Sequence, residues 1–338
     1  MRIRTSAPGK LFLLGEYAVL SGAPALLTAV DRRVAVSVED STSGSWQVSA
    51  PNLGIENLAL GPDGELPSGL DPRVRSSLRV VDAVREAVLA VASPRPRPLA
   101  ISIGSSAFSL DGHKLGLGSS AAVAAALTAA LGAALGIDRD QETLFRLADA
   151  AHRNAQGGVG SGGDVAASVY GGLIGYSQGA VPVPLRWPAE LEIMAVVTGE
   201  GSPTTRLVAG VAEYAAENPA GHRADIERLS ALAERAAAAL ADPDEFLSLA
   251  NSYFSALSQL DAHAHVGIVS ERHRELHDMA TRVGGAFKTS GAGGGDVGLA
   301  FSHRGEPARR LSATLTRAGA LIVPLGFLAA GLQEDPPL

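Results

Sequence analysis

The chain has 338 residues, a length that suggests two domains, and 46% of them are hydrophobic, which is ample material for a core. This apolar content excludes a disordered chain, and the lack of cysteine excludes a secreted module held together by disulfides. The 28 Lys and Arg against 35 Asp and Glu give a net charge of −7, which argues against a nucleic-acid-binding protein but leaves room for a local basic pocket.

In the first half of the chain, apolar runs alternate with glycine and proline over residues 1–39, a pattern that predicts strands and turns. Apolar residues at helical spacing predict a helix over Ser76–Ala92, and Leu99–Ile103 has the composition of a strand. We expect a loop over Gly104–Gly118 and a polar helix over Gln141–Gln156.

The longest uncharged stretch, Ser119–Ile137, has the length of a membrane span. Because it is mostly alanine and opens with two serines, we interpret it as a buried helix of a soluble protein. The apolar run Leu11–Leu14 is too short for a signal peptide, so a cytoplasmic location without membrane contact is the default expectation.

The second half mixes strands and helices. We expect strands over 173–176, 191–197, 297–301 and 320–323, and helices over 204–217, 223–241, 245–259 and from about residue 270. The prolines at 182, 184 and 188 mark a candidate connection between domains. The mixture predicts an α+β or α/β protein.

The first of three glycine-rich loops precedes the alanine-rich helix. Glycines at 116 and 118 let the backbone approach a ligand closely, and the N-terminus of the following helix favours an anion. The hydroxyls of Ser119 and Ser120 can bind phosphate or Mg²⁺, and Lys114 lies just ahead as a cation. The alternative is a turn that simply caps a helix.

Two known phosphate motifs can be tested on this loop. A Walker A loop is absent because no Gly-Lys-Ser/Thr is present. Gly116, Gly118 and Ala121 match the dinucleotide fingerprint, but the polar run Asp111–Lys114 that precedes them is not typical of a buried strand.

The other two loops carry candidate catalytic groups. Asp164 follows the loop Gly157–Gly163 and falls near a helix start, where it either serves the helix dipole or stands beside a reacting group. The loop Ser290–Gly295 contains three consecutive glycines, which are costly to order and favour a functional cradle over a plain turn. Near the N-terminus, Lys10 lies in an apolar strand-like context and needs an anionic partner.

Taken together, four segments resemble the GHMP kinases, the superfamily that includes galactokinase, homoserine kinase and mevalonate kinase. Pro8-Gly9-Lys10 comes first, then Gly-Leu-Gly-Ser-Ser-Ala at 116–121, Ser-Gly-Gly-Asp at 161–164 and Gly-Ala-Gly-Gly-Gly at 291–295. Within the superfamily, the sequence around Tyr17 and the second and third glycine loops most resembles the phosphomevalonate kinases.

The resemblance implies a two-domain α+β fold, with a ribosomal-protein-S5-like N-terminal domain over 1–185 and a ferredoxin-like C-terminal domain over 186–338. It implies transfer of the ATP γ-phosphate to 5-phosphomevalonate with Mg²⁺, and Lys10 and Asp164 as catalytic residues. The implied ATP-binding residues are Lys114, Gly116, Leu117, Gly118, Ser119 and Ser120. The implied acceptor-binding residues are Glu16, Tyr17, Ser161, Gly162, Ser202, Thr204, Thr205, Arg206, Ser290, Gly291, Ala292 and Gly293.

The metal shell departs from the mevalonate kinase pattern. Those enzymes carry a glutamate ahead of the Ser-Gly-x-Asp motif that ligates Mg²⁺, whereas the chain here reads Ala151-His152-Arg153-Asn154. Ser120 is then the best protein ligand, with ATP phosphates and water completing the shell.

Three alternative functions stay open at this point: mevalonate kinase or another small-molecule kinase of the superfamily, a dinucleotide-binding oxidoreductase, and a non-catalytic sensor on the kinase fold. His273 and His277 lie four residues apart on an expected helix and could face one metal, but we interpret them as a solvated face. The sequence sets no oligomeric state, and the expected partners are the two small-molecule substrates.

Overall fold

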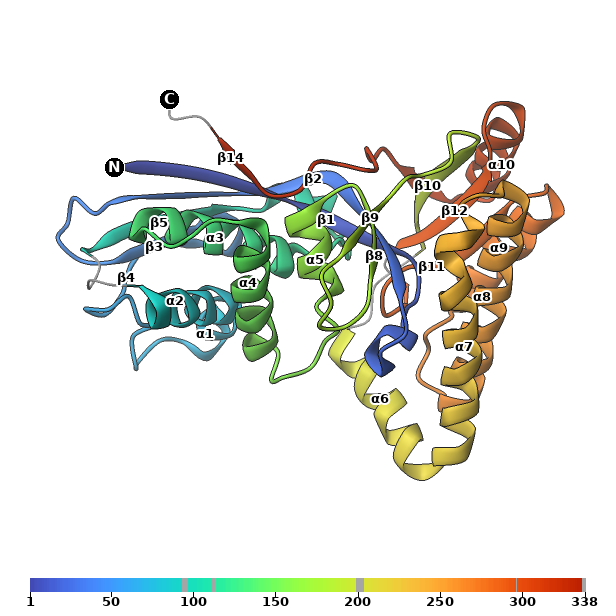
Figure 1. The fold of residues 1–338 in the computed structure, drawn as a ribbon, viewed down its shortest axis with the longest axis horizontal. Helices are drawn as coiled ribbons and strands as arrows, with labels where there is room; N and C mark the ends of the chain where they lie inside the picture. Colours follow the sequence, from blue (N-terminus) through green and yellow to red (C-terminus); the bar gives the residue numbers. More distant parts are fainter. Residues whose placement is uncertain (93–96, 111–112, 199–203, 296, 336–338) are drawn as a thin grey trace.

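The computed structural model describes residues 1–92, 97–110, 113–198, 204–295 and 297–335 (Figure 1). Two separate sheets organise the chain, and a two-stranded pair of β6 and β7 accompanies the first. The small elements are the 3-10 helices η1 (Ala18–Ser21), η2 (Pro51–Leu53) and η3 (Ser106–Phe108), the short helix α1 (Pro72–Ser77), and strands β6 (Ser109–Leu110) and β7 (His113–Lys114).

The first sheet is built on two long antiparallel strands, β1 (Arg2–Leu14) and β2 (Ala25–Asp40). Its strand order is β14-β1-β2-β5-β3-β4, and β8 and β9 extend it beside β2. The other members are β3 (Gln47–Ala50), β4 (Ile55–Ala59), β5 (Leu99–Gly104), β8 (Leu173–Tyr176), β9 (Val183–Leu185) and β14 (Gln333–Asp335). β1 is buried from Thr5 to its end, which places Lys10 in an apolar setting as predicted.

Helices cover this sheet around α3 (Ser119–Leu135), which packs on both β1 and β2. Because α3 is mostly alanine, neighbouring backbones approach it closely, and α2 (Arg79–Val91), α4 (Gln141–Ala155) and α5 (Gly163–Tyr170) surround it. The prediction of a buried helix here is confirmed. Among the described residues, no helix is both long and apolar enough to cross a membrane.

The second sheet has the order β11-β12-β10-β13, with every neighbouring pair antiparallel. This is the 4-1-3-2 order of a ferredoxin-like sheet. Its strands are β10 (Leu191–Val197), β11 (Ala286–Thr289), β12 (Val297–His303) and β13 (Leu321–Val323), and its helices are α6 (Thr204–Glu217), α7 (Pro219–Ala239), α8 (Pro243–Ala264), α9 (Glu271–Arg282) and α10 (Glu306–Arg317). α8, α9 and α10 pack on the sheet, and α6 and α7 extend away from it (Figure 1).

Most helices begin within a few residues of the predicted positions, and the α+β class is confirmed. Two segments differ. Within the proline-containing stretch, Val183–Leu185 forms strand β9 of the first sheet. The expected loop 104–118 contains the β6–β7 pair, whose two-residue strands are too short to show a periodic pattern.

Candidate active site

The first glycine loop ends at a helix N-terminus whose N-cap residue is a glycine. Gly116 and Gly118 have φ values of 65° and 76°, in the left-handed region that favours glycine. Gly118 is the N-cap residue of α3, and among the residues that the structure describes no side chain accepts a hydrogen bond from the first turn. The amide groups at the start of α3 are therefore available to an anion such as a nucleotide phosphate.

Lys10 lies directly beneath this loop. Its backbone N–H donates to the carbonyl of Leu117 at 2.9 Å, which joins β1 to the loop. A Cβ at Gly118 would lie 2.8 Å from Cε of Lys10, so a side chain there would displace the Lys10 side chain. The Lys10 side chain is almost fully buried, and its Nζ lies 3.3 Å from Oδ1 of Asp164. The two predicted catalytic residues therefore lie together.

Asp164 is held by the second glycine loop, in the first turn of α5, as predicted. Its side chain is 33% exposed, so it can face both Lys10 and a ligand. The carbonyl of Ser161 accepts hydrogen bonds from Arg153 at 3.1 Å and from the hydroxyl of Tyr176 at 2.7 Å. These bonds fix the loop just before Asp164, and Gly162, with φ of 84°, completes the turn into α5.

The third glycine loop is fastened to the N-terminal segment. The Ser290 hydroxyl accepts from the N–H of Phe12 at 3.0 Å and donates to its carbonyl at 2.9 Å. The Tyr17 hydroxyl donates to the carbonyl of Ala292 at 2.6 Å. A Cβ at Gly291 would lie 3.9 Å from Nζ of Lys10, so this loop forms a further side of the same site.

Beneath the third loop, Glu16 forms a buried ion pair with Lys288. Burial raises the pKa of Glu16, and the charge of Lys288 opposes that rise. Burial lowers the pKa of Lys288, and the charge of Glu16 opposes that fall without cancelling it. Glu16 was predicted to bind the acceptor; the structure places its carboxylate on Lys288, where it joins the turn that follows β1 to β11.

A buried histidine contacts the predicted metal ligand. Nε2 of His152, on α4, lies 3.0 Å from Oγ of Ser120 and 3.0 Å from the side-chain amide nitrogen of Gln156. Burial lowers the pKa of His152, against the opposite effect of the nearby Asp164, so the imidazole is neutral at neutral pH. Sequence reasoning missed this contact, because it depends on how α4 packs against α3.

The donor set around the first loop fits Mg²⁺ held mainly by nucleotide phosphates. Ser120 and Asp164 supply oxygen donors, which Mg²⁺ prefers. Within the described ranges, no group of three His, Cys, Asp or Glu side chains converges into a protein-only metal site. Held by these residues, Mg²⁺ would supply positive charge that offsets the charge of the ATP phosphates.

The remaining predicted site residues that the structure describes lie on β7 and at the start of α6. Lys114 is exposed on β7, ahead of the first loop, and Thr205 and Arg206 are exposed at the start of α6. Ser202 and the side chain of Thr204 lie outside the described residues.

The interpretation of His273 and His277 as a solvated face is wrong. His273 is fully buried, and His277 is stacked on Phe254 with its Nδ1 2.8 Å from the carbonyl of Phe287. The spacing places both on α9, but the helix turns them toward the protein interior because it packs on β11.

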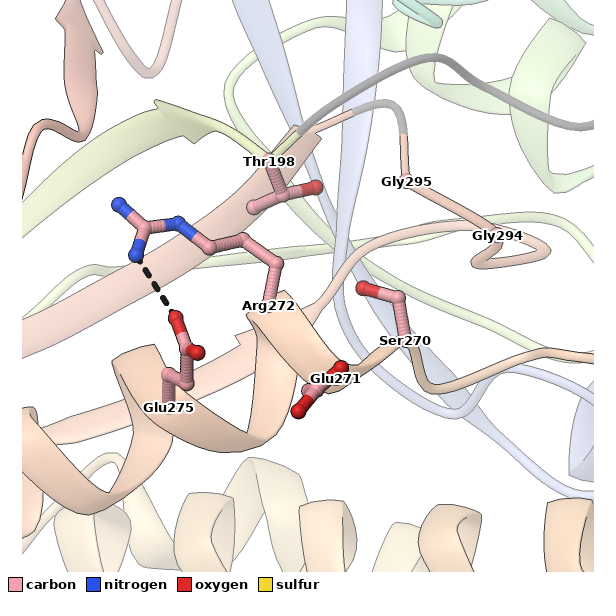
Figure 2. Close-up of a pocket in the computed structure, with 7 residues that line it drawn as sticks. All are labelled: Thr198, Ser270, Glu271, Arg272, Glu275, Gly294 and Gly295. Carbon is pink, nitrogen blue, oxygen red and sulfur yellow. Dashed lines mark hydrogen bonds and ion pairs between the residues drawn. The ribbon is translucent and has the colours of Figure 1, made fainter.

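A cavity of about 410 Å³ adjoins the third loop on the side of α9. Figure 2 shows Gly294 and Gly295 on one side of it and Ser270 and Arg272 of the α9 start on the other. The guanidinium of Arg272 is held by Glu275 at 2.9 Å.

These features define a class. A lysine–aspartate pair lies between an uncapped helix N-terminus and two further glycine loops, an arrangement suited to phosphoryl transfer from a nucleotide to a small molecule.

Comparisons with known proteins agree with this class of enzyme. Residues 78–172 match the model of the GHMP kinases N-terminal domain. The phosphomevalonate kinase of Streptomyces sp. (strain CL190) is 35% identical over 94% of this chain and 95% of its own, and the mevalonate kinase of Thermococcus sibiricus is 27% identical over 99% of both. The structure of Streptococcus pneumoniae phosphomevalonate kinase in complex with phosphomevalonate and AMPPNP aligns with a TM-score of 0.76 at 21% identity, over 97% of this chain and 99% of that one.

The chain belongs to the GHMP kinase family and is an ATP-dependent phosphotransferase. This membership goes against the dinucleotide interpretation of Gly116, Gly118 and Ala121. In agreement, only the two-residue strand β7 stands ahead of that loop in place of a buried strand.

Proposed function

We propose that this kinase transfers the ATP γ-phosphate to 5-phosphomevalonate, giving 5-diphosphomevalonate in the mevalonate pathway. The observation that carries the choice of acceptor is the charge of the site. Asp164 pairs with Lys10, Glu16 is neutralised by Lys288, and the buried partner of Ser120 is a neutral imidazole. A site with little free negative charge suits two phosphorylated substrates. The Streptomyces relative supports the same choice.

In the proposed reaction, an oxygen of the acceptor phosphate forms a bond to the γ-phosphorus of ATP. The bond from that phosphorus to the oxygen that bridges it to the β-phosphate breaks, and ADP leaves. The second pKa of a phosphate monoester is about 6, so the acceptor is largely ionised at pH 7 and needs no base to remove a proton. Catalysis then depends on position and charge.

Different residues of the site position the substrates and offset their charge. The amides at the start of α3 and the hydroxyl of Ser119 hold the ATP phosphates, and the Ser120 oxygen would hold the Mg²⁺ that accompanies them. Lys10 lies between donor and acceptor and offsets their repulsion. Asp164 orients the Lys10 ammonium, from which it is 3.3 Å distant, and receives any residual proton of the acceptor. The third loop, at Ser290–Gly293, offers hydroxyl and amide groups to the acceptor.

Mevalonate is the second candidate acceptor, favoured by the Thermococcus relative. It presents an alcohol, whose proton must leave, so Asp164 would act as general base. The partial exposure of Asp164 permits that role.

A coupled assay of ADP release with both acceptors tests the proposal. We expect kcat/KM for phosphomevalonate to exceed that for mevalonate by about 100-fold or more. Mevalonate lacks the phosphate, and each hydrogen bond to a charged group that is lost costs about 1.5–3 kcal/mol. A preference for mevalonate would contradict the proposed acceptor. ATP binding without turnover on either acceptor would instead indicate a non-catalytic sensor.

A further inference from the structure

The buried contact between Ser120 and His152 has no part in the reaction as written above. His152 is 5% exposed, so water does not compete for its Nε2. That nitrogen lies 3.0 Å from the amide nitrogen of Gln156, which can only donate a hydrogen bond. With that donor opposite, we infer that Nε2 carries its lone pair, and the Ser120 hydroxyl, also 3.0 Å away, is placed to donate to it alongside the amide.

The direction of this proton decides what the Ser120 oxygen can do. A serine hydroxyl has one proton and two lone pairs. Once the proton points at His152, Ser120 no longer donates to a phosphate, and both lone pairs are free to bind a cation. Ser120 stands in the first turn of α3, directly after the glycine loop.

A carboxylate in place of His152 could also accept a hydrogen bond from the Ser120 hydroxyl, but it would add a negative charge beside the phosphates. A neutral imidazole gives the same orientation without that charge. Asp164 already supplies a partly exposed carboxylate whose charge acts on His152.

We propose that His152 is a positioning residue of the nucleotide site. It accepts a hydrogen bond from the Ser120 hydroxyl and so fixes the Ser120 oxygen as a ligand for the cation that accompanies ATP. This inference rests on the kinase activity of the proposed function and is independent of the acceptor.

The test measures binding of AMPPNP by calorimetry at neutral pH, without acceptor, once with excess Mg²⁺ and once with EDTA. The variants are His152→Leu, Ser120→Ala and the double variant. With Mg²⁺, we expect His152→Leu to weaken binding about 10-fold, the effect of one hydrogen bond. In EDTA the loss should be under about 2-fold, and in the Ser120→Ala background His152→Leu should add nothing, because the two residues act as one unit.

Two variants serve as controls. His152→Gln places an amide oxygen near the position of Nε2 and should retain most of the affinity. His277→Leu removes a partly buried histidine of α9 and should leave affinity unchanged. If His152→Leu does not fold, His152→Asn, whose shorter side chain also withdraws the acceptor, takes its place.

An additive loss in the double variant, an equal loss in EDTA, or wild-type affinity of His152→Leu would each overturn the inference. A wild-type chain that fails to bind AMPPNP would overturn it together with the kinase assignment. A chain that passes this test yet prefers mevalonate contradicts the proposed acceptor alone.

Discussion

Lys10 shows how one residue is placed by its neighbours. β1 carries it below the first loop, Gly118 leaves room for its methylenes, and Asp164 faces its ammonium. The sequence predicted both charged residues because an apolar strand with one lysine, and an aspartate after a glycine loop, are local signals. That a side chain at position 118 would displace Lys10 is visible only once the strand and the loop are packed together.

We expect Lys10→Met to lower kcat by about 1000-fold, because it removes a cation from the point where phosphate charge develops. Asp164→Asn should lower it by about 100-fold, since the ammonium remains but loses its orientation. The coupled ADP assay with phosphomevalonate measures both effects. Arg146→Met removes an exposed cation of α4 and should leave kcat unchanged. Wild-type turnover in both site variants would contradict the assignment.

Other residues of the site gave no sequence signal of their role. Lys288 is part of a recognisable motif, but its partner Glu16 lies 272 residues earlier. His152 looks like one more position on an amphipathic helix until α4 is packed against α3. Contacts of this kind depend on tertiary structure, so no local pattern encodes them.

Helix α9 combines a predicted start with unpredicted burial. The sequence predicted a helix from about residue 270; Ser270 is its N-cap residue, and its hydroxyl accepts from the N–H of His273 at 3.2 Å. In return, Nδ1 of His273 accepts from the N–H of Ser270 at 3.0 Å, and its Nε2 lies 2.9 Å from the Thr198 hydroxyl. Because Nδ1 is an acceptor here, a proton on it would break the capping box.

This arrangement makes the stability of the protein depend on pH. Burial lowers the pKa of His273 to about 4; Arg274 and Lys288 act in the same direction and Asp261 opposes them. Since the unfolded pKa is about 6.5, the unfolded chain binds the proton first as pH falls. The free energy of unfolding should have its highest value above about pH 6.5 and should fall toward pH 4, by about 2 kcal/mol between pH 7 and pH 5.

Urea unfolding at both pH values measures the change. His273→Gln should lose about 2 kcal/mol less than the wild type over this interval. The control His303→Gln, at an exposed histidine paired with Asp244, should follow the wild type. Equal pH dependence in wild type and His273→Gln would show that His273 does not titrate in this range.

At the scale of the whole molecule, the end of the chain returns to the first sheet. β14 pairs with β1, and Ala330 and Gly331 accept hydrogen bonds from Arg33 on β2 at 2.7 Å (Figure 1). The sequence did not predict this return, because a three-residue strand has no periodicity and its partner lies about 330 positions away. The proposed division between residues 185 and 186 falls between β9 of the first sheet and β10 of the second.

At Gly331 the returning segment lies close against the backbone at the end of α5. A Cβ there would lie 2.3 Å from the carbonyl oxygen of Val169, at the end of α5, and 2.8 Å from the amide nitrogen of Gly171. These neighbours are backbone atoms and cannot move aside as a flexible side chain would. We expect Gly331→Ala to lower the free energy of unfolding by about 2–3 kcal/mol, a usual cost of overpacking. Differential scanning calorimetry measures the shift.

Gly69→Ala is the matched control, because a Cβ at Gly69 meets no atom within 4 Å. Hydrogen exchange should locate the effect of Gly331→Ala: the segment Arg4–Ser6, which pairs with β14, should lose protection, whereas β11 and β12 of the second sheet should keep theirs. Since α5 also carries Asp164, displacement of the segment against α5 should reduce turnover as well. Equal unfolding midpoints of Gly331→Ala and Gly69→Ala would mean that the returning segment adds nothing to the stability of the first sheet.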